Sequence, residues 1–215
     1  MTNFFQVKKK SQLSNARLGL ITTAHGKINT PAFIFCGTKA TVKSVLPSQL
    51  KLASTQIILS NTYHLMLQPG PEIISKEGGL QNFTHWNGPM MTDSGGYQIF
   101  SLGYGSVSEE IKGKNNNTKR KSLIKITEEG ASFRNYINGD KVFLSPERSI
   151  ELQRDFGADL IFVLDECTPF NVSKKYTEKS MYMSHRWAER CKNSFDSKFR
   201  NYEPTFGSSG KQSLY

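Results

Sequence analysis

The sequence predicts an α/β fold built on a parallel sheet, and three observations support this prediction. Residues 89–98 and residues 159–169 each run from an apolar stretch directly into acidic side chains, and strand-like segments alternate with helix-like ones. An apolar run without polar alternation is typical of a strand covered on both faces, as in parallel sheets wrapped by helices. The acids would then lie at the carboxyl ends of the strands, where such folds carry their chemistry.

The first half of the chain predicts a hairpin followed by short helices and buried strands. The hairpin is expected from its two strand-like segments around a Gly-containing turn, and the helices from prolines suited to a first turn. In order, we expect strands at 17–23 and 28–35 around a turn at 24–27, a helix opening at Pro47, a buried strand at 55–59, a helix at 71–78 and a strand ending before Asp93.

The second half predicts one more hairpin, two helices and one strand. Ser145, Pro146 and Glu147 offer a capping hydroxyl, a proline for the first turn and an acid for the positive helix end. In order, we expect strands at 131–137 and 141–144 around Asn138-Gly139-Asp140, a helix from 145 to 157, the strand leading to Asp165, and a helix from 173 to 199 whose core stripe is Tyr176, Met183, Trp187, Cys191 and Phe195.

The composition favours a cytoplasmic protein with a polyanionic partner. The 215 residues include 28 Lys and Arg against 18 Asp and Glu, which gives a formal charge of +10. Such an excess favours contacts with phosphates, although solvated faces produce it too. No window is apolar for long enough to cross a membrane, and residues 1–17 lack the apolar centre of a secretory signal.

Residues 109–126 are predicted to form a basic, flexible insertion. They hold six basic residues against two acids around Asn115-Asn116-Asn117, a low-complexity and turn-forming composition. A loop that touches RNA is the alternative interpretation.

The cysteines indicate neither a disulfide framework nor a metal site. Cys36, Cys167 and Cys191 are far apart and odd in number, and they form no Cys-x-x-Cys pair. We therefore expect no zinc site among these 215 residues.

Two acids at strand ends form the candidate site. Asp93 follows the apolar Met90-Met91 and precedes Gly95-Gly96, which would let a ligand approach the main chain closely. Asp165 ends the second apolar run, so the two carboxylates are expected to converge on one cleft from different strands. Capping of neighbouring helices by these acids remains the alternative.

Four segments together resemble the bacterial tRNA-guanine transglycosylases: Asn61–Leu65, Thr92–Gln98, Leu144–Ser149 and Asp165–Pro169. The resemblance covers the chain apart from the basic insertion. It implies a (β/α)8 TIM-type barrel, of which residues 1–215 would be the N-terminal portion, and a reaction that exchanges the wobble guanine of certain tRNAs for a deazaguanine precursor of queuosine. It also implies a covalent RNA intermediate on an aspartate, and members of the family are often homodimeric.

The resemblance also assigns roles to individual residues. Asp165 resembles the base-reading acid, and a carboxylate suits the adjacent N1–H and exocyclic amine of guanine. Tyr97 resembles the stacking ring that holds a flipped base. Ser94, Gly95 and Gly96 match residues lining the same pocket, and Asp93 matches the catalytic proton acceptor. For His64 and Cys167 structural roles are the expectation. Asn61 resembles a family residue at the ribose pocket, and a turn-forming role explains it equally well.

The chain departs from the family pattern beyond Tyr215. Full-length relatives continue with a Gln-Gly-Gly segment, the nucleophilic aspartate, a basic tRNA-binding stretch and a structural zinc site, none of which occurs here. We therefore expect an incomplete barrel, roughly its first half, that is inactive alone or depends on a complementary C-terminal chain. A non-catalytic RNA-binding subunit is the alternative, and a two-acid metal hydrolase is disfavoured because no ligand cluster accompanies Asp93 and Asp165.

Overall fold

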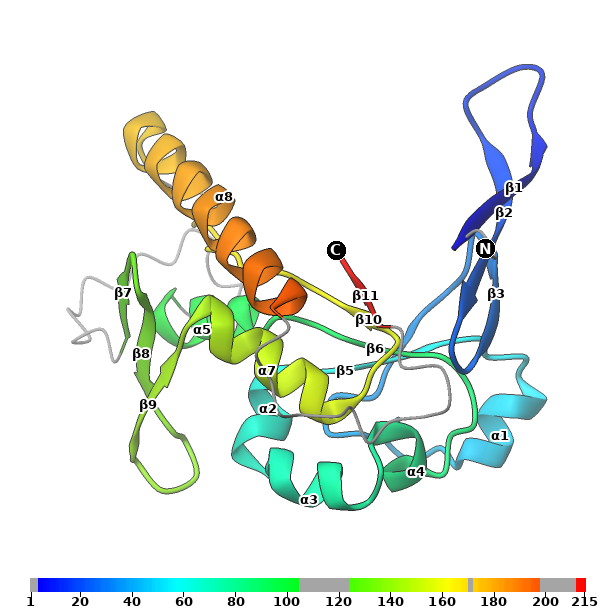
Figure 1. The fold of residues 1–215 in the computed structure, drawn as a ribbon, viewed down its shortest axis with the longest axis horizontal. Helices are drawn as coiled ribbons and strands as arrows, with labels where there is room; N and C mark the ends of the chain where they lie inside the picture. Colours follow the sequence, from blue (N-terminus) through cyan, green and yellow to red (C-terminus); the bar gives the residue numbers. More distant parts are fainter. Residues whose placement is uncertain (1–3, 105–123, 170–171, 198–211) are drawn as a thin grey trace. The chain divides into compact units, whose positions relative to one another are not determined.

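The structure, a computed structural model, describes residues 4–104, 124–169, 172–197 and 212–215 (Figure 1). Its contacts divide the chain into two compact units. The first comprises Met1–Asp93, Leu152–Ile161 and Arg200–Tyr215, and the second comprises Ser94–Glu151 and Phe162–Phe199. The basic segment predicted at 109–126 lies outside the described residues up to position 123.

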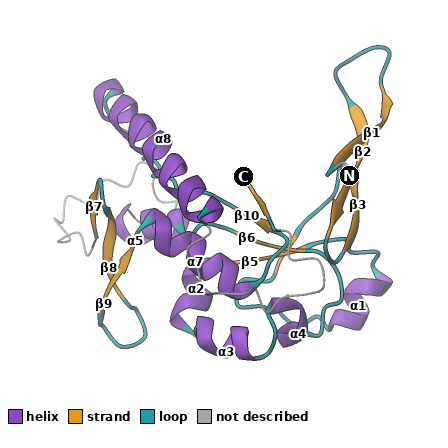
Figure 2. Ribbon diagram, in the orientation of Figure 1, coloured by secondary structure: helices purple, strands orange, loops and turns teal. Residues whose placement is uncertain are grey.

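A parallel sheet of five short strands forms the centre of the first unit (Figure 2). Its spatial order is β11-β10-β6-β5-β4. Each strand therefore lies beside the next strand of this sheet along the chain, and every pair is parallel. The strands are β4 (Phe35–Cys36), β5 (Ile58–Ser60), β6 (Met90–Thr92), β10 (Leu160–Ile161) and β11 (Ser213–Leu214). The predicted α/β architecture with a parallel sheet is confirmed.

The central strands of this sheet are buried, as continuous apolar runs predict, whereas the outer strands β4 and β11 are partly exposed. All three residues of β6 are buried, and so are both residues of β10. Ile58 of β5 is likewise buried. Thr92 satisfies its buried hydroxyl by donating to Oε1 of Gln153, 3.1 Å away.

The second apolar run pairs over a much shorter stretch than the sequence predicts. Strand β10 ends at Ile161, so Asp165 lies four residues beyond it and not at the strand end. Leu164 instead directs its main-chain N–H to Sγ of Cys191, 3.3 Å away in the long helix α8 (Lys174–Asp196). Docking on that helix replaces sheet pairing after Ile161.

An antiparallel sheet of three strands precedes the parallel one. Strand β2 (Arg17–Thr23) pairs with both β1 (Phe5–Lys10) and β3 (Gly26–Thr30). The prediction of one strand from 28 to 35 is wrong, because pairing stops at Thr30 and resumes only in β4. Pro31 has no N–H to donate, which explains the end of the ladder.

Four short helices complete the first unit: α1 (Pro47–Leu52), α2 (Thr62–Leu67), α3 (Pro71–Lys76) and α4 (Leu80–Thr84). The prolines that open α1 and α3 marked these two helices in the sequence. The sequence did not mark α2 and α4, because five or six residues do not establish a helical period. The strand expected at 55–59 is correspondingly displaced, to Ile58–Ser60.

The second unit combines three further helical segments with an antiparallel sheet. The elements are α5 (Gly96–Tyr104), β7 (Lys125–Thr127), β8 (Gly130–Arg134), β9 (Lys141–Leu144), the start of α7 (Pro146–Phe156), and α8. Ser145 and Ser173 cap α7 and α8 by accepting from main-chain N–H groups, as the sequence predicts for Ser145. Met183, Trp187 and Cys191 of the predicted stripe are buried. Every helix in the described part of the chain is too short or too polar to cross a lipid bilayer.

A buried carboxylate ties together the elements of the first unit. Asp159, only 2% exposed, accepts from the main-chain N–H groups of His25 (3.1 Å) and Met90 (3.0 Å) and from Nε2 of Gln81 (3.2 Å). Its Oδ1 also lies 2.9 Å from Nδ1 of His25. This hydrogen bond raises the pKa of His25 above its ordinary value, against an opposing effect of burial. The carboxylate thus joins the β2–β3 turn, α4 and β6 at the start of β10.

This arrangement predicts that Asp159→Asn destabilises the chain by about 1–3 kcal/mol, because the buried N–H donors lose a charged acceptor. His25 adds a pH dependence. Its raised pKa means that protonated His25 contributes stability below about pH 6.5. That contribution is lost as the pH rises through the folded-state value.

Urea unfolding of wild type and His25→Gln between pH 5.5 and 8.5 measures this contribution. The difference in unfolding free energy should be largest at low pH and should shrink at high pH. A difference that grows with pH would contradict the proposed pairing of His25 with Asp159.

Candidate functional site

Asp93 follows directly after β6, where the sequence places it. Its Oδ1 accepts from the main-chain N–H of Thr62 at 2.8 Å, and its Oδ2 accepts from Nδ2 of Asn61. The Thr62 hydroxyl donates to the main-chain carbonyl of Asp93 at 2.6 Å. The carboxylate therefore serves the first turn of α2, as the capping alternative predicts.

His64, two residues further along α2, has a pKa below its ordinary value, which favours the neutral imidazole. Burial lowers its pKa most, and the charge of Lys39 lowers it further, while the charge of Asp93 acts in the opposite direction. A neutral imidazole at physiological pH fits the structural role expected for His64.

In the second unit, Gly96 allows an unusually close approach of Asp165. A Cβ atom on Gly96 would lie 2.7 Å from the main-chain oxygen of Asp165 and 2.9 Å from its Oδ1. Real Cβ atoms do not come this close to other heavy atoms, so a side chain at position 96 would displace Asp165. The preceding Gly95 has φ of +88°, which also favours glycine. The geometry therefore favours glycine at both predicted positions, 95 and 96.

The hydroxyl of Ser94 links the two parts of this approach. Its Oγ accepts from the main-chain N–H of Gly96 at 3.3 Å and also hydrogen-bonds Asp165. Ser149 donates its hydroxyl to the main-chain carbonyl of Ser94 at 2.8 Å, which fixes the turn. Ser94, Gly96 and Asp165 are thus brought together as the sequence predicts.

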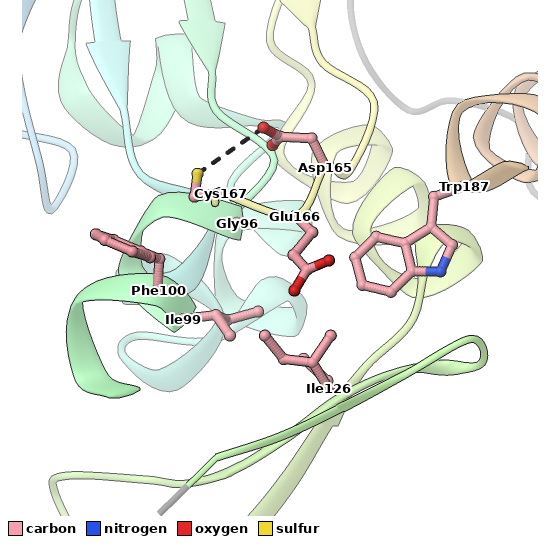
Figure 3. A pocket seen from close by; sticks show the side chains of 9 residues that line it. Gly96, Ile99, Phe100, Ile126, Asp165, Glu166, Cys167 and Trp187 are labelled. Atoms are coloured by element: carbon pink, nitrogen blue, oxygen red, sulfur yellow. Dashed lines mark hydrogen bonds between the residues drawn. The ribbon is translucent and has the colours of Figure 1, made fainter. Parts of the chain in front are cut away.

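The Asp165 carboxyl is solvent-accessible, yet its pKa is raised because the surrounding protein removes water from the charged form. A main-chain hydrogen bond at Asp165 itself opposes this effect, and hydrogen bonds from Cys167 and Ser94 add to the opposition. The Cys167 Sγ lies 3.8 Å from Oδ2 of Asp165 (Figure 3). A partly dehydrated carboxylate with weak protein donors favours hydrogen bonding to stronger ligand donors.

The segment around Asp165 is docked on one face of α8 by side chains spaced about one turn apart. These side chains hold main-chain and side-chain groups on both sides of Asp165. The contacts are Leu164 N to Cys191 Sγ (3.3 Å), Glu166 N to Ser184 Oγ (3.0 Å), Thr168 Oγ1 with Ser180 Oγ (2.8 Å) and Tyr176 Oη to Glu166 Oε1 (2.5 Å). The sequence predicts only the apolar part of this helix face, so its hydroxyls were missed.

A small hollow lies beside the Gly96–Asp165 contact, within the second unit. Figure 3 shows the Glu166 carboxylate directed into it between the Trp187 ring and the side chains of Ile99 and Ile126. Its volume of about 10 Å³ is that of one water molecule and is too small for a purine. Glu166 and Trp187 are lining residues that sequence reasoning missed, since Trp187 was assigned to the core.

Tyr97 directly follows Gly96 in the sequence and has an exposed ring. Its side chain lies on the first turn of α5 and is 49% exposed, with its ring centroid 6.2 Å from that of Phe100. An exposed ring is free to stack on a ligand, but its stacking role stays a prediction. So does the convergence of Asp93 and Asp165 on one base.

No metal centre is assigned. Within the residues that the structure describes, no three His, Cys, Asp or Glu side chains gather into a group that could hold a metal ion. The three cysteines are all free thiols.

The parallel sheet, the glycine turn after β6 and the carboxylate held against it define an α/β protein with an acid-lined site next to its main chain. The family model described as queuine tRNA-ribosyltransferase matches residues 11–211. The chain therefore belongs to the queuine tRNA-ribosyltransferase family.

Curated relatives with this name support the same conclusion. The chain is 45% identical to the queuine tRNA-ribosyltransferase of Roseiflexus sp. (strain RS-1) over 89% of its length and 48% of the relative's. It is 48% identical to the Staphylococcus haemolyticus protein over 86% of its length and 44% of the relative's. For the Vibrio vulnificus (strain YJ016) protein the values are 43%, 94% and 48%. The chain thus spans about half the length of these relatives.

The close approach at Gly96 predicts the effect of Gly96→Ala. Helix propensity alone would stabilise α5 by up to about 1 kcal/mol, whereas forcing Asp165 aside costs about 1–3 kcal/mol. We expect a net loss of roughly 1 kcal/mol in unfolding free energy. Chemical denaturation of both proteins tests this, and a stabilised variant would show that position 96 has room for a side chain.

Proposed function

We propose that this chain carries the base-recognising and proton-accepting part of a tRNA-guanine transglycosylase. This pentosyltransferase would exchange the wobble guanine of tRNA for a deazaguanine precursor of queuosine. The observation that carries the proposal is the Asp165 carboxylate held against Gly96 and Ser94, in a chain whose family match spans residues 11–211.

Asp165 would read the base. Guanine presents N1–H and the exocyclic amine side by side, and the two oxygens of one carboxylate accept both. In the structure Asp165 is hydrogen-bonded by its own main chain, by the Cys167 thiol and by the Ser94 hydroxyl, while its side chain stays accessible to solvent and so to a ligand. The main-chain N–H of Gly95 would close on the same base, Gly96 would leave room for the base beside its main chain, and Tyr97 would stack on the face of the base.

Asp93 would take a proton from the incoming base. Loss of this proton gives the base nitrogen the electron pair with which it attacks the ribose carbon, and the bond from that carbon to the leaving group breaks. Asn61 and Thr62 hold the Asp93 carboxylate in one orientation, which supports a fixed proton acceptor. The covalent intermediate would form on an aspartate in the part of the relatives that this chain does not span.

The same proposal extends to the fold. The five parallel strands in chain order β4-β5-β6-β10-β11 support an assignment as the N-terminal portion of a (β/α)8 barrel. Strands from elsewhere, either a complementary chain or a longer polypeptide, would complete the closure.

Base recognition predicts that residues 1–215 bind guanine and that Asp165→Asn weakens this binding by about 10- to 100-fold, because hydrogen bonds to a charged acceptor are worth about 1.5–3 kcal/mol. Binding should also fade with acidification at a higher pH than an ordinary aspartate would give, because the pKa of Asp165 is raised. Titration calorimetry at several pH values measures both effects. Unchanged binding in Asp165→Asn would remove Asp165 from the site.

Proton acceptance predicts a different pattern for Asp93. Residues 1–215 alone should incorporate no labelled guanine into tRNA, since they offer no matching nucleophile. Combined with the part of the relatives that this chain does not span, the protein should exchange guanine, and Asp93→Asn should abolish turnover while leaving tRNA binding intact. Enzyme-like exchange by residues 1–215 alone would overturn the first expectation. Full tRNA binding without exchange in the combined protein would favour a non-catalytic RNA-binding subunit.

A further inference from the structure

The β7–β8–β9 sheet has one buried face and one exposed face with a distinctive composition. Residues of β8 and β9 alternate between the two faces, and Ala131, Phe133 and Leu144 are buried on the inner one. The outer face carries Lys125, Ser132, Arg134, Lys141 and Phe143, of which all but Ser132 are exposed.

The strand register places the three cations of this face close together. Arg134 is directly opposite Lys141, and Lys125 is directly opposite Ser132, which is itself opposite Phe143. Directly opposed residues are about 5 Å apart and diagonal ones about 7–8 Å. Lys125 is therefore a diagonal neighbour of Arg134, and the three charges form one compact group beside the Phe143 ring.

No acid in the described part of the chain neutralises this group. Among the described residues, no carboxylate forms an ion pair with Lys125, Arg134 or Lys141. Asp140 and Glu129 lie in the turns at the two ends of the sheet. Glu128 next to them is already paired with Arg186 at 2.6 Å. Arg134 uses one donor on the main-chain carbonyl of Gly139, which leaves most of its guanidinium for a partner.

The exposed aromatic ring adds a second kind of contact. Phe143 is 48% exposed, and its ring lies over Gly130, where an added Cβ would meet it at 3.0 Å. Side chains of Tyr136 and Ile137 are also exposed in the turn that follows β8. Unpaired cations interleaved with exposed rings suit a partner with a phosphate backbone and unstacked bases.

We propose that the outer face of the β7–β8–β9 sheet, formed by Lys125, Arg134, Lys141 and Phe143, is a docking surface for the phosphate backbone of tRNA. The naming of tRNA as the occupant rests on the proposed function. The surface is separate from the residues assigned to the base, so it contributes affinity and register and not chemistry. The three cations each neutralise one phosphate, and Phe143 stacks on an unpaired base.

The test is tRNA binding by residues 1–215, measured by fluorescence anisotropy across a salt series. Replacing Lys125, Arg134 and Lys141 by Gln together should reduce the slope of log affinity against log salt by roughly 2 to 3, since each released phosphate contact removes about 0.7–0.9. Phe143→Ala should instead raise the Kd by about 5-fold or more at an unchanged slope, because stacking does not release counterions.

A matched control removes the same charge elsewhere. Lys27, Lys51 and Lys76 are exposed and lie on separate elements, so their joint replacement by Gln should change the salt slope much less. Circular dichroism of each variant verifies folding, and single replacements substitute for any triple variant that unfolds. Equal effects of the two triple variants would overturn the proposal, as would an unchanged slope in the first.

The outcomes also separate this inference from the proposed enzyme function. Loss of salt slope in a protein whose completed form never exchanges guanine would support the surface and contradict the enzyme. Exchange of guanine by the completed protein, with a tRNA affinity that the triple replacement leaves unchanged, would support the enzyme function and contradict the docking surface. Binding of the sheet to anionic vesicles, lost in the triple variant while tRNA affinity stays unchanged, would replace RNA by a membrane as the partner and overturn the proposal.

Discussion

The close approach of Asp165 to the main chain at Gly96 shapes the candidate base-binding site. The space that a Cβ atom would fill at position 96 is occupied by the main-chain oxygen and carboxylate of Asp165. Ser94 hydrogen-bonds both partners, and Ser149 fixes Ser94 in turn. The proposed base recognition depends on this geometry, because any side chain at 96 would displace the acid.

Holding Asp165 there costs stability, and α8 offsets the cost. The raised pKa of Asp165 means that its charged form is less favourable in the folded chain than in the unfolded one. Its segment has no sheet partner after Ile161, and hydrogen bonds to Cys191, Ser184, Ser180 and Tyr176 replace the missing ladder. A rigid helix thereby positions a loop residue, which is how functional side chains on loops achieve precise geometry.

The sequence predicted those features that depend on local chemistry. Apolar runs located β6 and β10, Pro47 and Pro71 located α1 and α3, and Gly95-Gly96 marked the close approach. It missed α2 and α4, which are too short for a helical period, and it extended the second apolar run to Asp165 as one strand. Beyond Ile161, Leu164 is buried without strand pairing, and its main-chain N–H is bonded to Cys191 of α8. The sequence also did not predict the hydrogen bonds that Asp159 accepts, because only folding brings His25, Gln81 and Met90 close to it.

The central claim is that the Asp165 carboxylate accepts the N1–H and exocyclic amine of guanine. A crystal structure of residues 1–215 soaked with guanine tests it most directly. We expect N1 and the exocyclic amine nitrogen of guanine to lie within about 2.7–3.0 Å of the two Asp165 carboxylate oxygens, with the Tyr97 ring parallel to the base. Guanine bound through other side chains, with Asp165 making no hydrogen bond to the base, would contradict it.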